Sequence, residues 1–411
     1  MTLGKKKIFL ALIIVGLIVL FSECINSKSG NDPRGRAFAG SASCVKCHQA
    51  ICGTYLHTAH YQSASPGSLS TIAGSFSKDS NTFAVNDSVK IVMEKRDSVP
   101  YQVMYVNDKE KEAKRFDIVF GNVKGQSYLY WKNDLVFQLP VSYFTALNSW
   151  TNSPGYTVGQ VNFNRPIVER CFECHSTFIR QVAQQSAGRQ IENAFDKSSL
   201  IYNIDCERCH GPAATHVNFH AAYPEEKQAR YIVSFKTLSR SQKIDMCAVC
   251  HSGNKNIMLR STFPFKPGDS LDNFMQRVYS PYDRPDVHGN QSQLLAQSQC
   301  FINSNMDCST CHNTHVKDRG NHAIYAQHCM TCHSEANHNF CKMADTSNIS
   351  FLKNNCTRCH MPAQPSNAIV VQTSKSNTNI ACYIITHRIA IYPKESEKIM
   401  SEEFNNKNHH Q

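Results

Sequence analysis

The feature that most constrains this chain is a five-residue pattern, Cys-x-x-Cys-His, which occurs seven times in 411 residues. With 19 Cys and 19 His, a random arrangement of the same composition would contain about 0.04 copies. We number the copies site 1 to site 7 in chain order: residues 44–48, 171–175, 206–210, 247–251, 308–312, 329–333 and 356–360. Any fold for this chain must therefore accommodate seven copies of one chemical site.

The spacing within each copy matches the attachment of a c-type haem. Positions i and i+3 of a helical turn share a face, so both thiols can form thioether bonds with one porphyrin. The His at i+4 lies on the same side and is the proximal iron ligand. The predicted thioether cysteines are Cys44, Cys47, Cys171, Cys174, Cys206, Cys209, Cys247, Cys250, Cys308, Cys311, Cys329, Cys332, Cys356 and Cys359. The predicted proximal ligands are His48, His175, His210, His251, His312, His333 and His360. The sequence thus predicts seven covalently bound haem c groups.

Zinc is the competing interpretation, because paired cysteines also build tetrahedral zinc sites. Such a site needs two pairs facing each other and has no use for a His directly after the second Cys. All seven pairs carry that His, and seven is an odd number. We therefore favour haem, and the same argument disfavours thioredoxin-like redox chemistry.

Twelve histidines outside the seven sites are available as distal iron ligands. His409 and His410 belong to a charged tail and are expected to be solvated. From spacing or isolation, we expect six of the others to be distal ligands: His60, His216, His288, His315, His338 and His387. The seventh is one of His57, His220, His322 and His328, with His57 as our candidate, or one haem stays five-coordinate. For each of these four, a surface or propionate-binding role fits the sequence equally well.

The number of distal ligands separates two functions. An iron with two His ligands has no open position and only passes electrons, whereas an open iron can bind nitrite, hydroxylamine or a similar small molecule. The sequence leaves both alternatives open at this point.

The N-terminus predicts export. Three lysines (residues 5–7) precede an apolar run over 8–21, which is short for a membrane span and typical of a signal peptide over 1–23. Cys24 follows in a context similar to a lipoprotein signal, apart from Glu23, so it is a lipidation candidate; ordinary cleavage or an uncleaved anchor are the alternatives. The composition of residues 24–39 predicts a flexible tether. We expect a protein on the periplasmic or outer-surface side, tethered to the membrane as a lipoprotein.

The net charge of +11 can be explained without binding to nucleic acid. Two propionates on each of seven haems would contribute about −14, so the basic excess serves as counter-charge. We predict no nucleic-acid partner.

The sites are unevenly spaced and divide the chain. We expect a first haem-binding segment over 40–75, a β-rich insert over 76–165 and a six-haem region over 166–393, followed by a frayed polar tail over 394–411. Alternating apolar residues near 76–145 predict antiparallel strands, with a turn at 132–134. Elsewhere porphyrins replace a side-chain core. The predicted fold class is therefore a mainly α and irregular multihaem cytochrome c fold with a β-rich insert.

Four further cysteines lie outside the haem motifs: Cys52, Cys300, Cys341 and Cys382. In an oxidising compartment they can form two disulfides in three connectivities. The sequence does not choose among them, although we favour Cys300–Cys341.

Longer motifs resemble the cytochrome c-552/4 (c554-like) multihaem family. Residues 40–48 followed by 57–60 are similar to its opening; residues 206–216 resemble its Cys-x-x-Cys-His-Gly-Pro-Gly-x-x-His element, with Ala213 in place of the last Gly. Residues 308–315 and 356–362 resemble its Cys-x-x-Cys-His-x-x-His and Cys-His-Met-Pro elements. The resemblance implies closely stacked haems that carry electrons, and a relationship to hydroxylamine oxidoreductases, multihaem nitrite reductases and tetrathionate reductases. It also implies distal roles for His60, His216, His315, His338 and His387.

We therefore predict an exported cytochrome that relays electrons in a respiratory chain. Its expected partners are a quinone-linked or periplasmic donor and a terminal reductase or oxidase. The alternative is an oxidoreductase of a small nitrogen or sulfur compound at one open haem. The chain has no Cys-x-x-Cys-Lys motif, which is typical of the catalytic haem in many multihaem nitrite reductases, and this favours the electron carrier.

Overall fold

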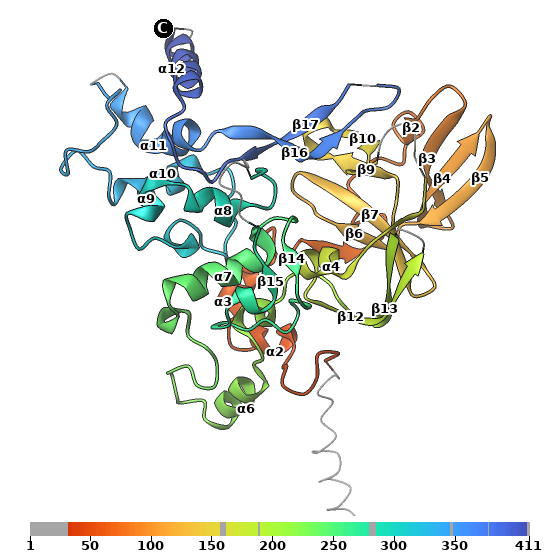
Figure 1. Ribbon diagram of the computed structural model, residues 1–411, viewed down its shortest axis with the longest axis horizontal. Helices are drawn as coiled ribbons and strands as arrows, with labels where there is room; N and C mark the ends of the chain where they lie inside the picture. The colour runs from red at the N-terminus through yellow and green to blue at the C-terminus, as the bar shows by residue number, and fades with distance from the viewer. Residues whose placement is uncertain are drawn as a thin grey trace, which may run out of the picture.

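Two regions of different character lie side by side in the computed structural model of the protein (Figure 1). The β region contains the strands between residues 64 and 201, and the attachment region contains the short helices and loops that carry most of the seven sites. The structure describes residues 32–156, 162–187, 190–278, 285–345, 348–376 and 378–408. The predicted signal peptide, Cys24, His409 and His410 lie outside these residues.

The β region is built from antiparallel strands in two main sheets. A curled sheet has the order β1-β6-β7-β8-β13-β12, with β9, β10 and β11 joined to its side, and a second sheet has the order β2-β3-β4-β5. The strands are β1 (Ala64–Pro66), β2 (Thr82–Ala84), β3 (Val89–Arg96), β4 (Val99–Val106), β5 (Lys109–Arg115), β6 (Ile118–Phe120), β7 (Gly125–Lys132), β8 (Leu135–Gln138), β9 (Val141–Phe144), β10 (Ser149–Asn152), β11 (Arg165–Pro166), β12 (Phe178–Ala187) and β13 (Gln190–Ile201).

Tight turns set the register of the second sheet. The β3–β4 turn has Asp97 and Ser98 at positive φ, and the β4–β5 turn has Asn107 and Asp108 at positive φ. Two successive residues of this kind form the turn whose twist matches antiparallel strands, and Asn and Asp tolerate it well. In the curled sheet, Asn133 begins the β7–β8 turn with a φ of 55°, within the turn that the sequence predicted.

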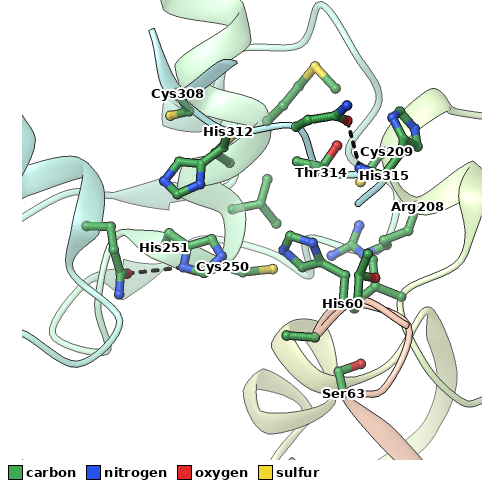
Figure 2. A pocket seen from close by; sticks show the side chains of 18 of the residues that line it. His60, Ser63, Arg208, Cys209, Cys250, His251, Cys308, His312, Thr314 and His315 are labelled. Carbon is green, nitrogen blue, oxygen red and sulfur yellow. Dashed lines mark hydrogen bonds between the residues drawn. The ribbon is translucent and has the colours of Figure 1, made fainter. Parts of the chain in front are cut away.

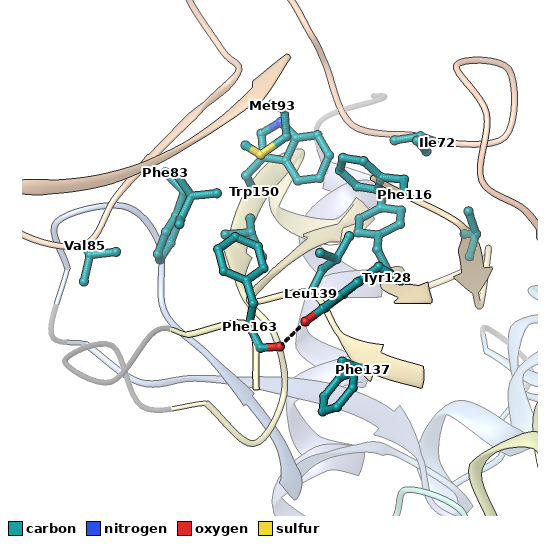
Figure 3. Packing of buried hydrophobic residues seen from close by; sticks show 14 residues of the cluster. Ile72, Phe83, Val85, Met93, Phe116, Tyr128, Phe137, Leu139, Trp150 and Phe163 are labelled. Carbon is teal, nitrogen blue, oxygen red and sulfur yellow. Dashed lines mark hydrogen bonds between the residues drawn. The ribbon is translucent and has the colours of Figure 1, made fainter. Parts of the chain in front are cut away.

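An aromatic cluster fills the interior of the β region (Figure 3). Trp150 is 3% exposed, and its ring lies 5.7 Å from that of Tyr128 and 6.3 Å from that of Phe116. Its indole N–H donates to the carbonyl of Ser75 at 3.0 Å. Gly74 is required beside it, because a Cβ there would overlap the indole ring. The region therefore has a conventional close-packed side-chain core.

The helices of the molecule are short. They are α2 (Ser41–Val45), α3 (Gln49–Tyr55), η1 (Thr145–Leu147), α4 (Glu169–His175), α5 (Cys206–His210), α6 (Ala214–Ala222), η3 (Phe235–Thr237), α7 (Arg240–His251), η4 (Leu271–Asn273), α8 (Gln291–Ala296), α9 (Gln299–Ile302), η5 (Cys308–Thr310), α10 (His322–Met330), α11 (Ile349–His360) and α12 (Pro393–Asn408). Two small strands, β14 (Ile257–Met258) and β15 (Met275–Gln276), pair with each other. No described helix is long and apolar enough to cross a membrane.

A hairpin of β16 (Ala363–Val371) and β17 (Ile380–Ile385) leaves the end of α11 and reaches across to the β region (Figure 1). At the far end of the hairpin, Thr373 forms a β-bridge with Thr151. The backbone N–H of Lys375 donates to the carbonyl of Ala84 at 2.9 Å. The hairpin thus joins the two regions.

The expectation of a mainly α fold was wrong. Strand residues are nearly as numerous as helix residues, and the curled sheet continues through β12 and β13, beyond the range in which alternation predicted strands. The hairpin β16–β17 adds strands inside the expected six-haem region. Residues 393–408, expected to belong to a frayed tail, form α12, with Ile399 and Met400 buried.

Candidate haem-binding site

Each of the seven motifs lies on or across a short helical turn, as the chemistry of the pattern requires. Sites 2, 3, 4 and 7 end α4, α5, α7 and α11; site 5 begins at η5, site 6 spans the end of α10, and site 1 joins α2 to α3. At site 1 the N–H of His48 donates to the carbonyl of Cys44 at 2.9 Å, and His312 and His333 make the same bond to the first Cys of their motifs. This turn places both thiols and the imidazole on one side.

Local caps begin several of these turns. The Ser239 hydroxyl accepts from the backbone N–H of Gln242, and the Gln242 side chain accepts from the backbone of Ser239, a capping box that starts α7. Asp205 accepts from the N–H of Arg208 at 2.8 Å and starts α5, while Asp307 caps η5. Local sequence alone thus specifies where these helices begin.

In two motifs, a buried glutamate between the two cysteines connects neighbouring sites through hydrogen bonds. Glu207, which is 3% exposed, accepts the backbone N–H groups of Ala39, Gly40 and Ala213. Arg34 donates to Glu207 at 3.0 Å. This buried network binds the N-terminal segment to site 3 and so brings site 1 beside it.

A second buried carboxylate, that of Glu173 in site 2, connects sites 2, 3 and 4. Its side chain accepts from Arg170 at 3.1 Å and from the backbone N–H of Thr262 at 2.5 Å. Arg170 also donates to the carbonyl of Val249 in site 4, and Arg208 of site 3 donates to the carbonyl of Glu173. Sequence reasoning assigned no role to these variable positions, and no local signal marks their long-range partners.

A cavity of about 3390 Å³ runs through the attachment region, and residues of all seven sites line it. A pocket for one drug-sized ligand is about 300–1,000 Å³, so this space suits several large planar groups. Most of the exposed surface that lines it is apolar. Part of the wall comes from the β region, including Phe120, Gln126 and Phe144.

Thiols from different sites lie close enough to interact, and these contacts define which sites are neighbours. In four pairs of sites, the helices that carry the motifs pack against each other: α2 against α5, α4 against α7, α7 against η5, and α10 against α11. In the same four pairs of sites a thiol of one site shifts the pKa of a thiol of the other: Cys44 with Cys206, Cys174 with Cys250, Cys247 with Cys308, and Cys329 with Cys356. Longer-range electrostatic interactions join Cys209 to Cys250 and Cys311 to Cys329. The sites therefore form a row in the order 1-3-4-5-6-7, with site 2 branching from site 4.

Three motif histidines, predicted to be proximal ligands, each lie near one histidine predicted to be a distal ligand. The ring centroids of His60 and His251 are 6.2 Å apart. Figure 2 shows the two imidazoles as neighbours in this part of the cavity. The same separation is 5.9 Å for His210 and His315.

The third pair belongs to site 5, where the ring centroids of His312 and His387 are 6.0 Å apart. An imidazole nitrogen lies about 2 Å from a bound metal ion, so two imidazoles on opposite sides of one iron have centroids about 6 Å apart. The three measured separations fit that arrangement.

These imidazoles are held in the form that binds metal. Burial lowers the pKa of His60 to about 4, and His251 contributes further. Burial likewise lowers the pKa of His387 to about 4, with His312 as the next cause. Both side chains are therefore neutral at pH 7, and a neutral imidazole is the ligand form.

Site 2 has a different environment. The ring of Phe120 stacks on His175 with centroids 4.7 Å apart, and the Ser63 hydroxyl donates to the His175 carbonyl at 2.9 Å. Burial lowers the pKa of His175 to about 4, and His288 is the next cause. His288 lines the same cavity as His175 and His251 and interacts electrostatically with both.

Several histidines use their second ring nitrogen in a way that is typical of metal ligands. The Nδ1–H of His360 donates to the carbonyl of Ala390 at 2.9 Å, and that of His216 donates to the carbonyl of Arg230 at 2.7 Å. His251 Nδ1 bonds the side-chain oxygen of Gln291 at 3.1 Å (Figure 2). Such bonds fix the tautomer and aim Nε2 at the metal.

The other candidates are not placed as clearly. His57 is exposed at the cavity wall, and His338 lies on an exposed turn with a φ of 54°. The rings of His216 and His220 are 4.6 Å apart, too close to lie on opposite sides of one iron.

Two more alternatives line the cavity near sites 5, 6 and 7. His322 Nδ1 bonds the Thr357 hydroxyl of site 7 at 2.9 Å. His328 lies near His312.

The non-haem cysteines give no support to the favoured disulfide. Cys52, Cys300, Cys341 and Cys382 are all free thiols in the structure. Cys300 interacts with Cys311, and Cys341 with Cys359, so the thiols favoured as partners lie near different attachment sites.

The residues present fit covalently bound haem. Paired thiols on helical turns, neutral imidazoles at the appropriate separation and an apolar cavity form one consistent set. The thioethers would form at the paired cysteines, and the motif histidines would be the proximal ligands.

Comparison with known proteins agrees with this assignment. The family model for cytochrome c554 and c-prime matches residues 144–211, which contain sites 2 and 3. The crystal structure of the outer cell wall cytochrome OcwA superposes with a TM-score of 0.51 and 15% identity, covering 88% of this chain and 81% of that chain. No curated protein matched the sequence significantly. The shared fold and the family match support a multihaem c-type cytochrome with covalently bound haem c.

Proposed function

We propose that the protein is an exported seven-haem c-type cytochrome that relays electrons in a respiratory chain through mostly bis-His haems. The observation that carries this proposal is the set of three facing imidazole pairs with centroids 5.9 to 6.2 Å apart. An electron carrier needs both axial positions filled, and a distal His at the right separation from a proximal His fills the second one.

Haem iron, when bound, supplies one-electron chemistry by cycling between its ferric and ferrous forms. The protein's part is to hold and tune each site. In this proposal His60 is the distal ligand at site 4, His315 at site 3, His387 at site 5 and His288 at site 2. For sites 1, 6 and 7 the candidates are His216, His322 and His338, with His57, His220 and His328 as the remaining alternatives.

The neighbour relations of the thiols support a continuous path for electrons. Site 1 and site 7 lie at opposite ends of the row 1-3-4-5-6-7, so one end can receive electrons and the other can release them. Expected partners are a quinone-linked or periplasmic donor protein and a terminal reductase or oxidase.

The proposed location is outside the cytoplasmic membrane. Covalent haem c is attached there, and the apolar run over 8–21 with Cys24 is consistent with a lipid-tethered, periplasmic or outer-surface protein. The structural neighbour OcwA is an outer cell wall cytochrome, which supports a location outside the cytoplasmic membrane for this protein too.

Spin-state spectroscopy of the loaded protein tests the proposal. We expect a low-spin resting spectrum and no spectral change with nitrite, hydroxylamine or cyanide. His387→Ala should convert one haem in seven to the high-spin form, because its distal ligand at site 5 is removed. His409→Ala, in the polar tail, is the control and should leave the spectrum unchanged.

A different result would favour the enzymatic alternative. A resting high-spin fraction near one haem in seven that changes on adding these compounds would indicate an open haem and an oxidoreductase of a small nitrogen compound. Mass spectrometry of the purified protein counts the haems directly, and fewer than seven would contradict the proposed number.

A further inference from the structure

We propose that Asp286 is a positioning residue that holds His288 against site 2 and couples this ligand to the hairpin β16–β17. The inference rests on the proposed bis-His function. It concerns a residue that belongs to no attachment motif and does not line the cavity that His288 lines.

The carboxylate of Asp286 joins two segments that are distant in the sequence. Its Oδ1 accepts the backbone N–H of His288 at 2.8 Å and the hydroxyl of Ser366 at 2.7 Å. Its Oδ2 accepts the backbone N–H of Asn367 at 2.5 Å. Two backbone donors and one hydroxyl therefore depend on one side chain, and charge-assisted bonds of this kind are the stronger class.

The loop that carries His288 is fixed from the other side as well. The Asn290 side chain donates to the carbonyl of Asp286 at 3.0 Å, which closes the loop on itself. The carbonyl of Gly289 accepts the N–H of Gly253, just after site 4, at 2.7 Å. The loop therefore spans from the end of α7 to the hairpin, and the imidazole of His288 enters the cavity between them.

The hairpin is itself anchored at its far end. Ser374 accepts the backbone N–H of Ala84 in β2 at 2.8 Å, and Asn152 of β10 accepts the N–H of Gln372 at 2.6 Å. Rigid strands of the β region thus fix the hairpin, and Asp286 transmits that position to His288. The β region thereby helps to define the axial ligand of site 2.

Removing the carboxylate would leave three donors without their acceptor. Asn367 is exposed and water can replace its acceptor, but Ser366 is buried and His288 is half-buried. A buried or half-buried donor without an acceptor is costly, and the loop would relax until water reaches it. The backbone of His288 would then no longer be held, and the imidazole would leave site 2. The hairpin would keep its independent contacts with β2 and β10.

The test compares spin states of haem-loaded variants, with haem content verified by mass. His288→Ala is the reference and should make one haem in seven high-spin. Asp286→Ala should produce the same change, and the double variant should produce no more than either single one, because both act on one ligand. Asp117→Ala is the matched control: Asp117 is a carboxylate of the β region that accepts the backbone N–H of Trp131 at 2.8 Å, and its loss should leave all haems low-spin.

The outcomes separate this inference from the proposed function. A low-spin wild type, a high-spin haem in His288→Ala and a fully low-spin Asp286→Ala would overturn the inference and leave the proposed function standing. An unchanged spectrum in His288→Ala would remove His288 as a ligand and overturn the inference too. If Asp286→Ala loads haem poorly, Asp286→Asn is the second variant. It keeps the size of the side chain but turns an NH₂ group toward hydrogen-bond donors, so we expect some high-spin haem. A fully loaded and fully low-spin Asp286→Asn would contradict the inference.

Discussion

The β region and the attachment region fill their interiors in different ways. In the β region, Phe83, Phe116, Tyr128 and Trp150 are almost completely buried against one another. In the attachment region, a chain segment of comparable length surrounds a cavity of about 3390 Å³. Because an unfilled apolar cavity costs stability in proportion to its size, the second arrangement is sustainable only with large groups inside. One chain can therefore combine a region whose core consists of side chains with a region whose interior is shaped for bound cofactors.

The largest expected effect comes from withholding haem. Chain produced without haem-attachment machinery should keep the β region folded and lose the attachment region, because the β region has an extensive aromatic side-chain core, whereas the attachment region has only a small buried cluster around Phe265 and Phe274. Limited proteolysis followed by mass spectrometry should yield a protected fragment within residues 64–201, with cleavage throughout 206–360. Equal resistance of both parts would contradict this difference between the regions.

A large effect is expected from Trp150→Ala. Truncating a fully buried aromatic residue costs about 4 kcal/mol, so the urea midpoint of the β region, followed by far-UV circular dichroism, should fall sharply. Trp131→Ala is the matched control: Trp131 is only half-buried, and the loss should be smaller. Loss of low-spin haem at more than one site in Trp150→Ala would indicate that the two regions are coupled beyond the contact through the hairpin β16–β17.

Arg34→Ala should weaken the attachment region instead. Arg34 contacts Asp205 and Glu207 within 3.0 Å, with its side chain 6% exposed, so its removal leaves buried carboxylates without a cation. Breaking such a pair costs about 3 kcal/mol, which unfolding followed by Soret absorbance would detect. The exposed pair of Lys90 and Asp108 in the β region provides the contrast, and Lys90→Ala should cause no measurable change. Similar losses in both variants would argue that burial is not the deciding factor.

The smallest expected effect concerns one helix cap. Ser239→Ala removes the hydroxyl that begins α7, the helix that ends in site 4, and should cost about 1 kcal/mol. Thermal unfolding of the loaded protein measures it, with Ser350→Ala, an exposed residue in the first turn of α11, as the control. A loss of stability in Ser239→Ala larger than that in Arg34→Ala would mean that the cap matters more than the buried ion pairs, contrary to our expectation.

The fold could be predicted only in part from the sequence. Alternating apolar residues between 82 and 144 and the turn at Asn133 were readable because strand periodicity is local. The strand β12, Phe-Ile-Arg-Gln-Val-Ala-Gln-Gln-Ser-Ala, has little alternation, and β16 contains Pro365, which usually argues against a strand. Such segments become strands because they pair with a neighbouring strand, which their own sequence does not reveal. The amount of β structure was therefore underestimated.

The candidate site shows a similar division. The prediction of thioether cysteines and proximal ligands needs only five consecutive residues, since the chemistry of attachment is confined to one helical turn. The partners His60 and His251 come from segments far apart in the chain, and Asp286 and Gln291 carry no motif that would identify them. Their roles depend on which loops the fold brings together.

By itself, the sequence determined the number and spacing of the Cys-x-x-Cys-His motifs and predicted their chemistry, because the covalent attachment of haem requires residues that are close together in the chain. Only the tertiary structure decided which imidazoles face each other, how the sites are ordered and how the hairpin connects them to the β region. Those features depend on long-range packing and buried charge networks such as that of Arg34 and Glu207, which no single segment encodes.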